Sequence, residues 1–143
     1  MRCGYRDYPS SIVKEFCNQF VGPGYRVRTI AVIEDDPSML QGLKRLLSAH
    51  GFRVRTFASA ESFLDGIANC EVDCLLLDIH LGGISGIDLL RRLTSSRTDL
   101  PVIFMTAIDS QATRQEAFDA GCIAYLKKPF LAKPLIDAIN GAA

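Results

Sequence analysis

The chain has 143 residues, and its 16 lysine and arginine residues balance 16 aspartate and glutamate residues, so the formal net charge is zero. This length suffices for one ordinary domain, and 48% apolar with 22% charged residues is typical of a soluble globular protein. The balanced charge argues against binding to nucleic acid or to an anionic membrane through overall charge, and no apolar run reaches membrane-spanning length.

Residues 1–27 stand apart from the rest of the chain. The stretch SSIVKEFCNQF favours one short amphipathic helix, and the VGPGYR that follows is typical of a turn. The charged and amide side chains of this segment make it a poor secretory signal. The five cysteines of the chain form no C-x-x-C pair, so we expect reduced thiols in a cytoplasmic protein. We therefore expect an N-terminal extension at 1–27 and one domain at 28–143.

From residue 28 onward, short apolar runs alternate with longer amphipathic segments. The expected strands are RTIAVIE (28–34), FRVRTF (52–57), DCLLLD (73–78), PVIFMT (101–106) and CIAYLK (122–127). Helices are expected over 37–51, 59–70, 86–96, 110–121 and 131–143, where apolar side chains recur at helical spacing. Pro37 suits the start of a helix and Ser59 an N-cap, whereas Gly51 and Gly121 suit helix ends.

The strands predicted at 73–78 and 101–106 are apolar without alternation, as parallel strands covered on both faces require. Five such strands separated by helices predict an α/β fold with a doubly wound, five-stranded parallel sheet of the flavodoxin-like kind. In these sheets ligands bind at the carboxyl ends of the strands, where the winding direction switches. We therefore expect the functional site at that edge.

Polar side chains stand at the carboxyl ends of four predicted strands. They are Glu34, Asp35 and Asp36 after the first strand, Asp78 on the third, Thr106 on the fourth, and Lys127 and Lys128 on and after the fifth. Because these strand ends meet at one edge, acids, a hydroxyl and an ammonium group are expected to line one pocket. Carboxylates crowded into a pocket raise one another's pKa unless a cation balances them, and Mg²⁺, which prefers oxygen ligands, suits this set.

The motifs VIEDDP, LLLDIHLGGISGIDLL, VIFMTA and AYLKKPF occur in this order over about residues 28–141. With them the chain resembles the receiver domain of bacterial two-component response regulators. The resemblance implies that Glu34, Asp35 and Asp78 bind Mg²⁺ and that Asp78 is the phospho-acceptor. It also implies that Thr106 is the hydroxyl residue and Lys128 the lysine that assist phosphoryl transfer, whereas Asp36 and Lys127 fall on variable positions.

Four further expectations follow from the resemblance. Tyr125 matches an aromatic switch position, for which a core tyrosine is the alternative. The Lys128–Pro129 bond is a candidate cis peptide. His80 lies where side chains of the family influence phosphoryl lifetime, for which an exposed loop histidine is the alternative. The family often has proline where this chain has Gly82, so we expect a looser loop after Asp78.

On this interpretation Asp78 takes a phosphoryl group from a histidine kinase or a histidine phosphotransfer protein and forms an acyl phosphate. Mg²⁺, Lys128, and Thr106 with nearby backbone N–H groups would each hold one phosphoryl oxygen. Such a module is not an enzyme for a separate substrate, because it catalyses only its own phosphorylation and dephosphorylation. The phosphoryl group would draw in Thr106 and let Tyr125 turn inward. This would change the face of the last helix, strand and helix, which a downstream protein or a second copy of the chain would then bind.

Alternatives remain at this point. The chain ends soon after the last predicted helix, which favours a single-domain receiver that acts through protein contacts without binding nucleic acid directly. A phosphorelay intermediate, a phosphate sink and a segment of a longer regulator stay open. The acidic EDDPS disfavours a flavin mononucleotide binder, and an aspartyl-phosphate hydrolase of similar fold would need a cap segment over its substrate. A receiver that signals without phosphate is disfavoured because all the key side chains are present.

Overall fold

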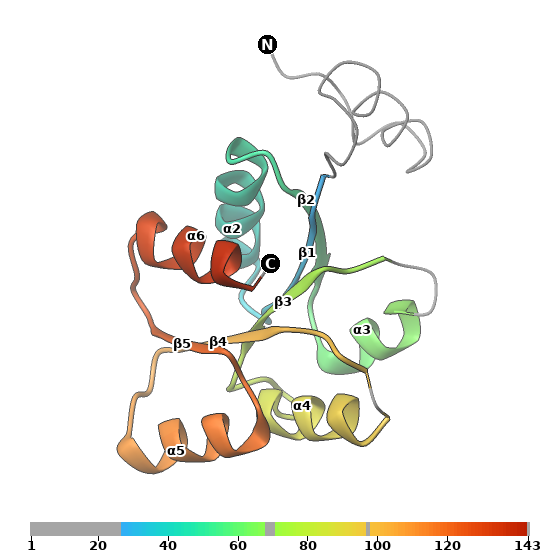
Figure 1. Cartoon of the computed structure of the whole chain (residues 1–143), viewed down its shortest axis with the longest axis vertical. Helices are drawn as coiled ribbons and strands as arrows, with labels where there is room; N and C mark the ends of the chain where they lie inside the picture. The colour runs from blue at the N-terminus through green and yellow to red at the C-terminus, as the bar shows by residue number, and fades with distance from the viewer. Residues whose placement is uncertain (1–26, 68–70, 97, 143) are drawn as a thin grey trace.

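The computed structural model describes residues 27–67, 71–96 and 98–142, so the helix predicted within residues 1–27 lies outside the described residues. Strands and helices alternate along the described chain (Figure 1). The strands are β1 (Thr29–Ile33), β2 (Arg53–Phe57), β3 (Cys74–Asp78), β4 (Val102–Thr106) and β5 (Ala124–Lys127). The helices are α2 (Pro37–Ala49), α3 (Ala60–Gly66), α4 (Gly86–Ser95), α5 (Gln111–Ala120) and α6 (Ala132–Gly141). Each lies within the range predicted for it.

The five strands form one parallel sheet in the order β2-β1-β3-β4-β5. The chain passes from β1 outward to β2 and then returns to β3, which lies on the other side of β1. The winding direction therefore switches between the carboxyl ends of β1 and β3, where open α/β sheets bind their ligands. The predicted doubly wound sheet is confirmed.

Helices cover both faces of the sheet, with α2 and α6 on one face and α3, α4 and α5 on the other (Figure 1). In β1, Ile30 and Val32 pack against the α2 and α6 side, while Ala31 and Ile33 pack against the opposite side. This alternation follows from the two-residue period of a strand. Strands β1, β3 and β4 are buried along their whole length, which is why their sequences lack polar alternation.

Asp36 begins helix α2 and has a structural role that the sequence analysis missed. Its carboxylate accepts hydrogen bonds from the N–H groups of Ser38 and Met39, and Pro37 occupies the first turn as predicted. Among the other predicted signals, the Ser59 hydroxyl caps α3. Gly51 and Gly121 follow α2 and α5 with φ of 88° and 109°, values that suit glycine at a helix end.

Gly86 lets α4 begin directly against the backbone of β3. A Cβ at this position would lie 2.3 Å from the carbonyl oxygen of Asp78 and 2.9 Å from Cα of Ile79. Because these are backbone atoms of a buried strand end, they have little room to move. We expect Gly86→Ala to lower the free energy of unfolding, measured in urea, by about 1–3 kcal/mol.

Gly42 provides the matched control for this prediction. It lies inside α2, and a Cβ there would meet no other atom within 4 Å. Gly42→Ala is therefore expected to raise the free energy of unfolding by about 0.5–1 kcal/mol, because alanine favours a helix interior. Equal effects of the two substitutions would contradict the close approach of α4 to Asp78.

Candidate functional site

Three carboxylates meet at the carboxyl ends of β1 and β3. Glu34 and Asp35 directly follow β1, and Asp78 is the last residue of β3. One carboxylate oxygen from each residue lies within 4.8 Å of the other two. The residues Glu34 and Asp78 are buried, at 1% and 5% exposed, whereas Asp35 is exposed to solvent. The structure therefore brings the predicted acidic cluster together, with Asp35 on its solvent side.

Lys128 contacts both buried acids from the end of β5. Its Nζ donates hydrogen bonds to Oε2 of Glu34 at 2.5 Å and to Oδ2 of Asp78 at 3.1 Å. Its backbone N–H donates to the carbonyl oxygen of Thr106 at 2.7 Å, and the Lys128–Pro129 peptide is cis, as the resemblance implied. The predicted lysine therefore joins the cluster.

Burial and charge act together in this cluster. Burial is the main reason why the pKa of Glu34 lies above its ordinary value, although hydrogen bonds from Lys128 and from the N–H of Asp36 oppose the shift. Burial lowers the pKa of Lys128, but the hydrogen bond to Glu34 and the charge of Asp78 outweigh it, so this pKa is raised. Three carboxylates against one ammonium group leave two negative charges, which one divalent cation would balance.

The donor atoms of the cluster suit a hard cation. The three acids offer only carboxylate oxygens, which Mg²⁺ prefers and binds at about 2.0–2.1 Å. Two oxygens on opposite sides of one Mg²⁺ would therefore be about 4 Å apart. The three oxygens lie within 4.8 Å of one another, so in donor type and in proximity the residues present fit a magnesium ion.

The chain turns back over the Asp78 carboxylate as it leaves β3. Oδ1 of Asp78 accepts a hydrogen bond from the N–H of His80 at 3.1 Å, and the N–H of Gly86 donates to the carbonyl oxygen of Ile79 at 2.9 Å. The His80 residue itself is exposed. The backbone N–H of His80, in the loop after Asp78, therefore lies beside the carboxylate.

Thr106 lies at the predicted strand end, but its hydroxyl is engaged elsewhere. The residue is fully buried at the end of β4 and is paired in register with Lys127. Its hydroxyl donates to the carbonyl oxygen of Ile108 at 2.9 Å and accepts from the N–H of Ile108 at 3.1 Å. Within the described parts of the chain, no hydrogen bond joins Thr106 to the acids. The side chain is bound to the loop that follows β4.

Tyr125 is half-buried on β5 and is bound to α5 and the segment before it. Its hydroxyl donates to Oδ1 of Asp109 at 3.2 Å, and the guanidinium of Arg114 lies 5.0 Å from the ring centroid while donating to Oδ2 of Asp109. Burial raises the pKa of the Tyr125 hydroxyl, and Asp109 raises it further. No sequence motif marks Asp109 or Arg114, so neither was predicted. The tyrosine hydroxyl was the one available signal, since a half-buried hydroxyl needs a partner.

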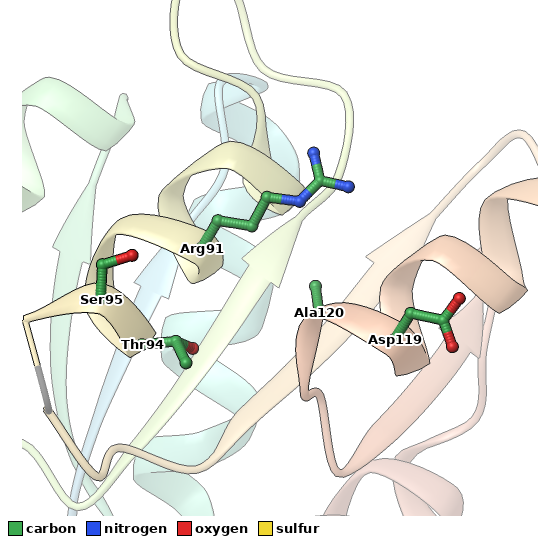
Figure 2. A pocket seen from close by; sticks show the side chains of 5 residues that line it. All are labelled: Arg91, Thr94, Ser95, Asp119 and Ala120. Atoms are coloured by element: carbon green, nitrogen blue, oxygen red, sulfur yellow. The ribbon is translucent and has the colours of Figure 1, made fainter.

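A separate hollow of about 400 Å³ lies between α4 and α5 (Figure 2). It is lined by Arg91, Thr94, Ser95, Asp119 and Ala120. These residues come from the carboxyl-terminal halves of both helices. Because the helices run antiparallel to the strands, the hollow lies toward the amino edge of the sheet, away from the acids. None of the predicted site residues lines it.

Comparison with known proteins finds response regulators that match this chain over most of its length. A model of the response regulator receiver domain matches residues 30–140. The chain is 34% identical over 114 residues to the transcriptional regulatory protein TdiR of Thauera aromatica, covering 80% of this chain and 50% of TdiR. It is 30% identical over 137 residues to the response regulator protein TmoT of Ectopseudomonas mendocina, covering 96% of this chain and 60% of TmoT. The chain thus spans about half the length of these relatives.

Solved structures of receiver domains superpose on the described fold. The crystal structure of FixJ-N matches with a TM-score of 0.77 at 29% identity, covering 82% of this chain and 94% of that one. A response regulator receiver domain protein from Clostridium thermocellum matches with a TM-score of 0.76 at 32% identity, covering 81% of this chain and 94% of that one. Both similarities extend over nearly the full length of the matched structures.

Proposed function

The chain belongs to the response regulator receiver domain family, and from this premise we propose that Asp78 accepts a phosphoryl group from a histidine kinase or a histidine phosphotransfer protein. Glu34, Asp35 and Asp78 would hold the Mg²⁺ that this transfer requires. The observation that carries the proposal is the convergence of these acids with Lys128 at the switch point of the sheet. Such a module acts on itself and has no separate substrate.

Asp78 is the nucleophile in this proposal. A carboxylate oxygen forms a bond to phosphorus while the phosphorus–nitrogen bond of the phosphohistidine breaks, and the leaving imidazole takes up a proton. Lys128, whose Nζ already lies 3.1 Å from Oδ2 of Asp78, would stabilise a phosphoryl oxygen as a compact positive charge. The N–H of His80, now bonded to Oδ1, is a second donor beside the reacting group. A bound Mg²⁺ would supply further charge neutralisation at the phosphoryl oxygens.

The segment after β4 connects this site to Tyr125. For the Thr106 hydroxyl to reach a phosphoryl oxygen, it must leave the backbone of Ile108. The next residue, Asp109, holds the hydroxyl of Tyr125. A phosphoryl group adds a charge of about −1.5 to −2, so it favours an arrangement in which Thr106 moves toward it. Movement of Ile108 and Asp109 would then release Tyr125 to turn inward.

The face formed by α5, β5 and α6 would transmit the change. Large apolar side chains are exposed on or beside these elements, with Phe118 at 46% and Ile123 at 47% exposed. Ile108 and Leu131 are exposed as well. Exposed apolar groups of this kind favour a protein contact. We propose that a downstream protein or a second copy of this chain binds here when Asp78 is phosphorylated.

Within the described residues, no helix is both long enough and apolar enough to span a bilayer. A cytoplasmic location remains a prediction that follows from the proposed partners, which deliver phosphoryl groups inside the cell. The division of the chain at residue 27 also remains a prediction, although the family model begins at residue 30.

The two buried cysteines among the described residues, Cys74 and Cys122, are free, and burial raises the pKa of each to about 11.

Incubation with a small phosphodonor and Mg²⁺ tests the proposal. We expect uptake of one phosphoryl group per chain, measured by intact-protein mass spectrometry, and loss of this uptake when a chelator removes the metal. An aspartyl-phosphate hydrolase would instead release many equivalents of phosphate per chain through the acids after β1. Sustained release of that kind, without a phosphorylated chain, would contradict the receiver function.

His80 offers a test of phosphoryl lifetime. His80 follows the acceptor by two residues, its backbone N–H contacts the Asp78 carboxylate and the residue is exposed, so we propose that its ring restricts the approach of water to the acyl phosphate. We expect His80→Asn, which replaces the ring by a smaller amide, to speed dephosphorylation roughly two- to fivefold, equivalent to about 0.5–1 kcal/mol. The rate is measured from the decay of the phosphorylated mass after donor removal. Equal rates would show that the histidine is only a solvent-exposed loop residue.

A further inference from the structure

Glu61 joins helix α3 to the loop between β3 and α4. Its Oε1 accepts a hydrogen bond from the N–H of Ile84 at 2.9 Å, across 23 residues of sequence. The neighbouring Gly83 has φ of 79°, and a Cβ on it would lie only 2.6 Å from the same oxygen. A side chain at position 83 would therefore be strained and would displace the carboxylate. The position of the Glu61 carboxylate therefore requires glycine at residue 83.

The base of Glu61 is firmly held. It lies in the first turn of α3, where the Ser59 hydroxyl caps the helix by accepting the N–H of Ser62. Phe63, two residues further on, is fully buried and packs edge-to-face against Phe57, with ring centroids 5.3 Å apart. Glu61 is therefore a carboxylate on a fixed support, and its contact with Ile84 restrains the loop relative to the core.

The middle of the loop has few other polar restraints. Its first residues are bonded to the Asp78 carboxylate through the N–H of His80, and Gly86 closes it by donating to Ile79. Between these ends, Leu81 packs into the core, but a Cβ on Gly82 would meet no atom within 4 Å and Gly83 adopts positive φ. Two adjacent glycines give a backbone many accessible conformations. The hydrogen bond of Glu61 to Ile84 restrains the segment directly after them.

We propose that Glu61 is a positioning residue for phosphoryl transfer, because its bond to Ile84 fixes the loop from which the backbone N–H of His80 donates to the Asp78 carboxylate. The inference rests on the proposed function. Donors that are already in place when charge develops stabilise a transition state without reorganisation. A loop freed from α3 would have to be ordered during each transfer, and that ordering would slow the reaction.

Three variants separate the roles of the carboxylate. Glu61→Ala removes the acceptor, and we expect phosphorylation by a small phosphodonor with Mg²⁺ to slow about three- to tenfold, the scale of one lost charge-assisted hydrogen bond at an exposed site. Glu61→Gln keeps an oxygen that can accept from Ile84, so it should restore most of the rate. Asp65→Ala removes an exposed acid about one turn further along the same helix and should react like the wild type.

Amide hydrogen exchange gives a readout that does not depend on the reaction. We expect the Ile84 N–H to exchange faster in Glu61→Ala than in the wild type, and to be protected again in Glu61→Gln. A purely structural role would lower the urea midpoint of Glu61→Ala but leave the phosphorylation rate of the folded protein unchanged. With a purely structural role, Glu61→Gln would have no lost rate to restore.

The outcomes separate this inference from the proposed function. A wild-type chain that takes up no phosphoryl group would overturn the proposed function and the inference with it. A wild-type chain that is phosphorylated at the same rate as Glu61→Ala would overturn the inference alone. So would a slow Glu61→Gln variant in which Ile84 is still protected, because the hydrogen bond would then be present without its expected effect.

Discussion

Asp78→Asn should take up no phosphoryl group from a small phosphodonor in the presence of Mg²⁺. The amide has the size of the carboxylate and can still accept the N–H of His80, but it is not a nucleophile toward phosphorus. Asp78 is the last residue of the central strand β3, and the backbone N–H of His80 in the following loop contacts it. We therefore expect complete loss of the phosphorylated mass.

Asp36→Asn is the matched control for this experiment. Asp36 is adjacent to the acidic cluster in sequence, but it is exposed and its carboxylate caps α2. Asparagine caps a helix about as well as aspartate, so the variant should fold normally and take up one phosphoryl group per chain. Phosphorylation of Asp78→Asn at the wild-type level would show that another residue is the acceptor.

Lys128→Met should slow phosphoryl transfer by roughly 10²–10³-fold, the scale expected when one preorganised charge is removed from the reacting group. The ammonium group lies 3.1 Å from Oδ2 of Asp78 and also binds Glu34, so no other cation among the described residues contacts both buried acids. Methionine keeps the length of the apolar stem but lacks the charge. The rate is measured at saturating Mg²⁺, so that a change in metal binding does not obscure the effect.

Lys127→Met is the control for the loss of a lysine at this strand end. Lys127 precedes Lys128 directly, but it is exposed and has no hydrogen bond or ion pair to the acids. We expect its rate to match that of the wild type. If the two substitutions slowed phosphorylation equally, the contact of Lys128 with Glu34 and Asp78 would not contribute to the rate of phosphoryl transfer.

Much of this site follows from the sequence because it is made of strand ends. An apolar run precedes each of the charged residues: Glu34 and Asp35 follow β1, Asp78 ends β3, and Lys128 follows β5. A doubly wound sheet brings these strand ends to one edge. The sequence could not distinguish Glu34 from Asp35, because burial depends on which side of the strand end each side chain occupies. In the structure, Glu34 is buried and bonded to Lys128, whereas Asp35 is exposed.

The hydrogen-bond partners of several side chains could not be predicted from the sequence. The sequence predicts that a phosphoryl group draws in Thr106, but it does not reveal that the hydroxyl first binds Ile108, where the backbone after β4 offers both a donor and an acceptor. The partners of Tyr125 and the bond from Glu61 to Ile84 likewise depend on how helices pack on the sheet. An exposed glutamate in the first turn of a helix is common, and nothing in the sequence around Glu61 indicates that it restrains a loop.

The most direct test of the central claim is a crystal structure of the protein with Mg²⁺ and beryllofluoride, a mimic of the phosphoryl group. The account predicts one Mg²⁺ bound by carboxylate oxygens of the cluster Glu34, Asp35 and Asp78, and beryllofluoride attached to Asp78. It also predicts that Nζ of Lys128 contacts a fluorine atom. A metal ion bound elsewhere on the chain, or beryllofluoride attached to any other residue, would contradict it.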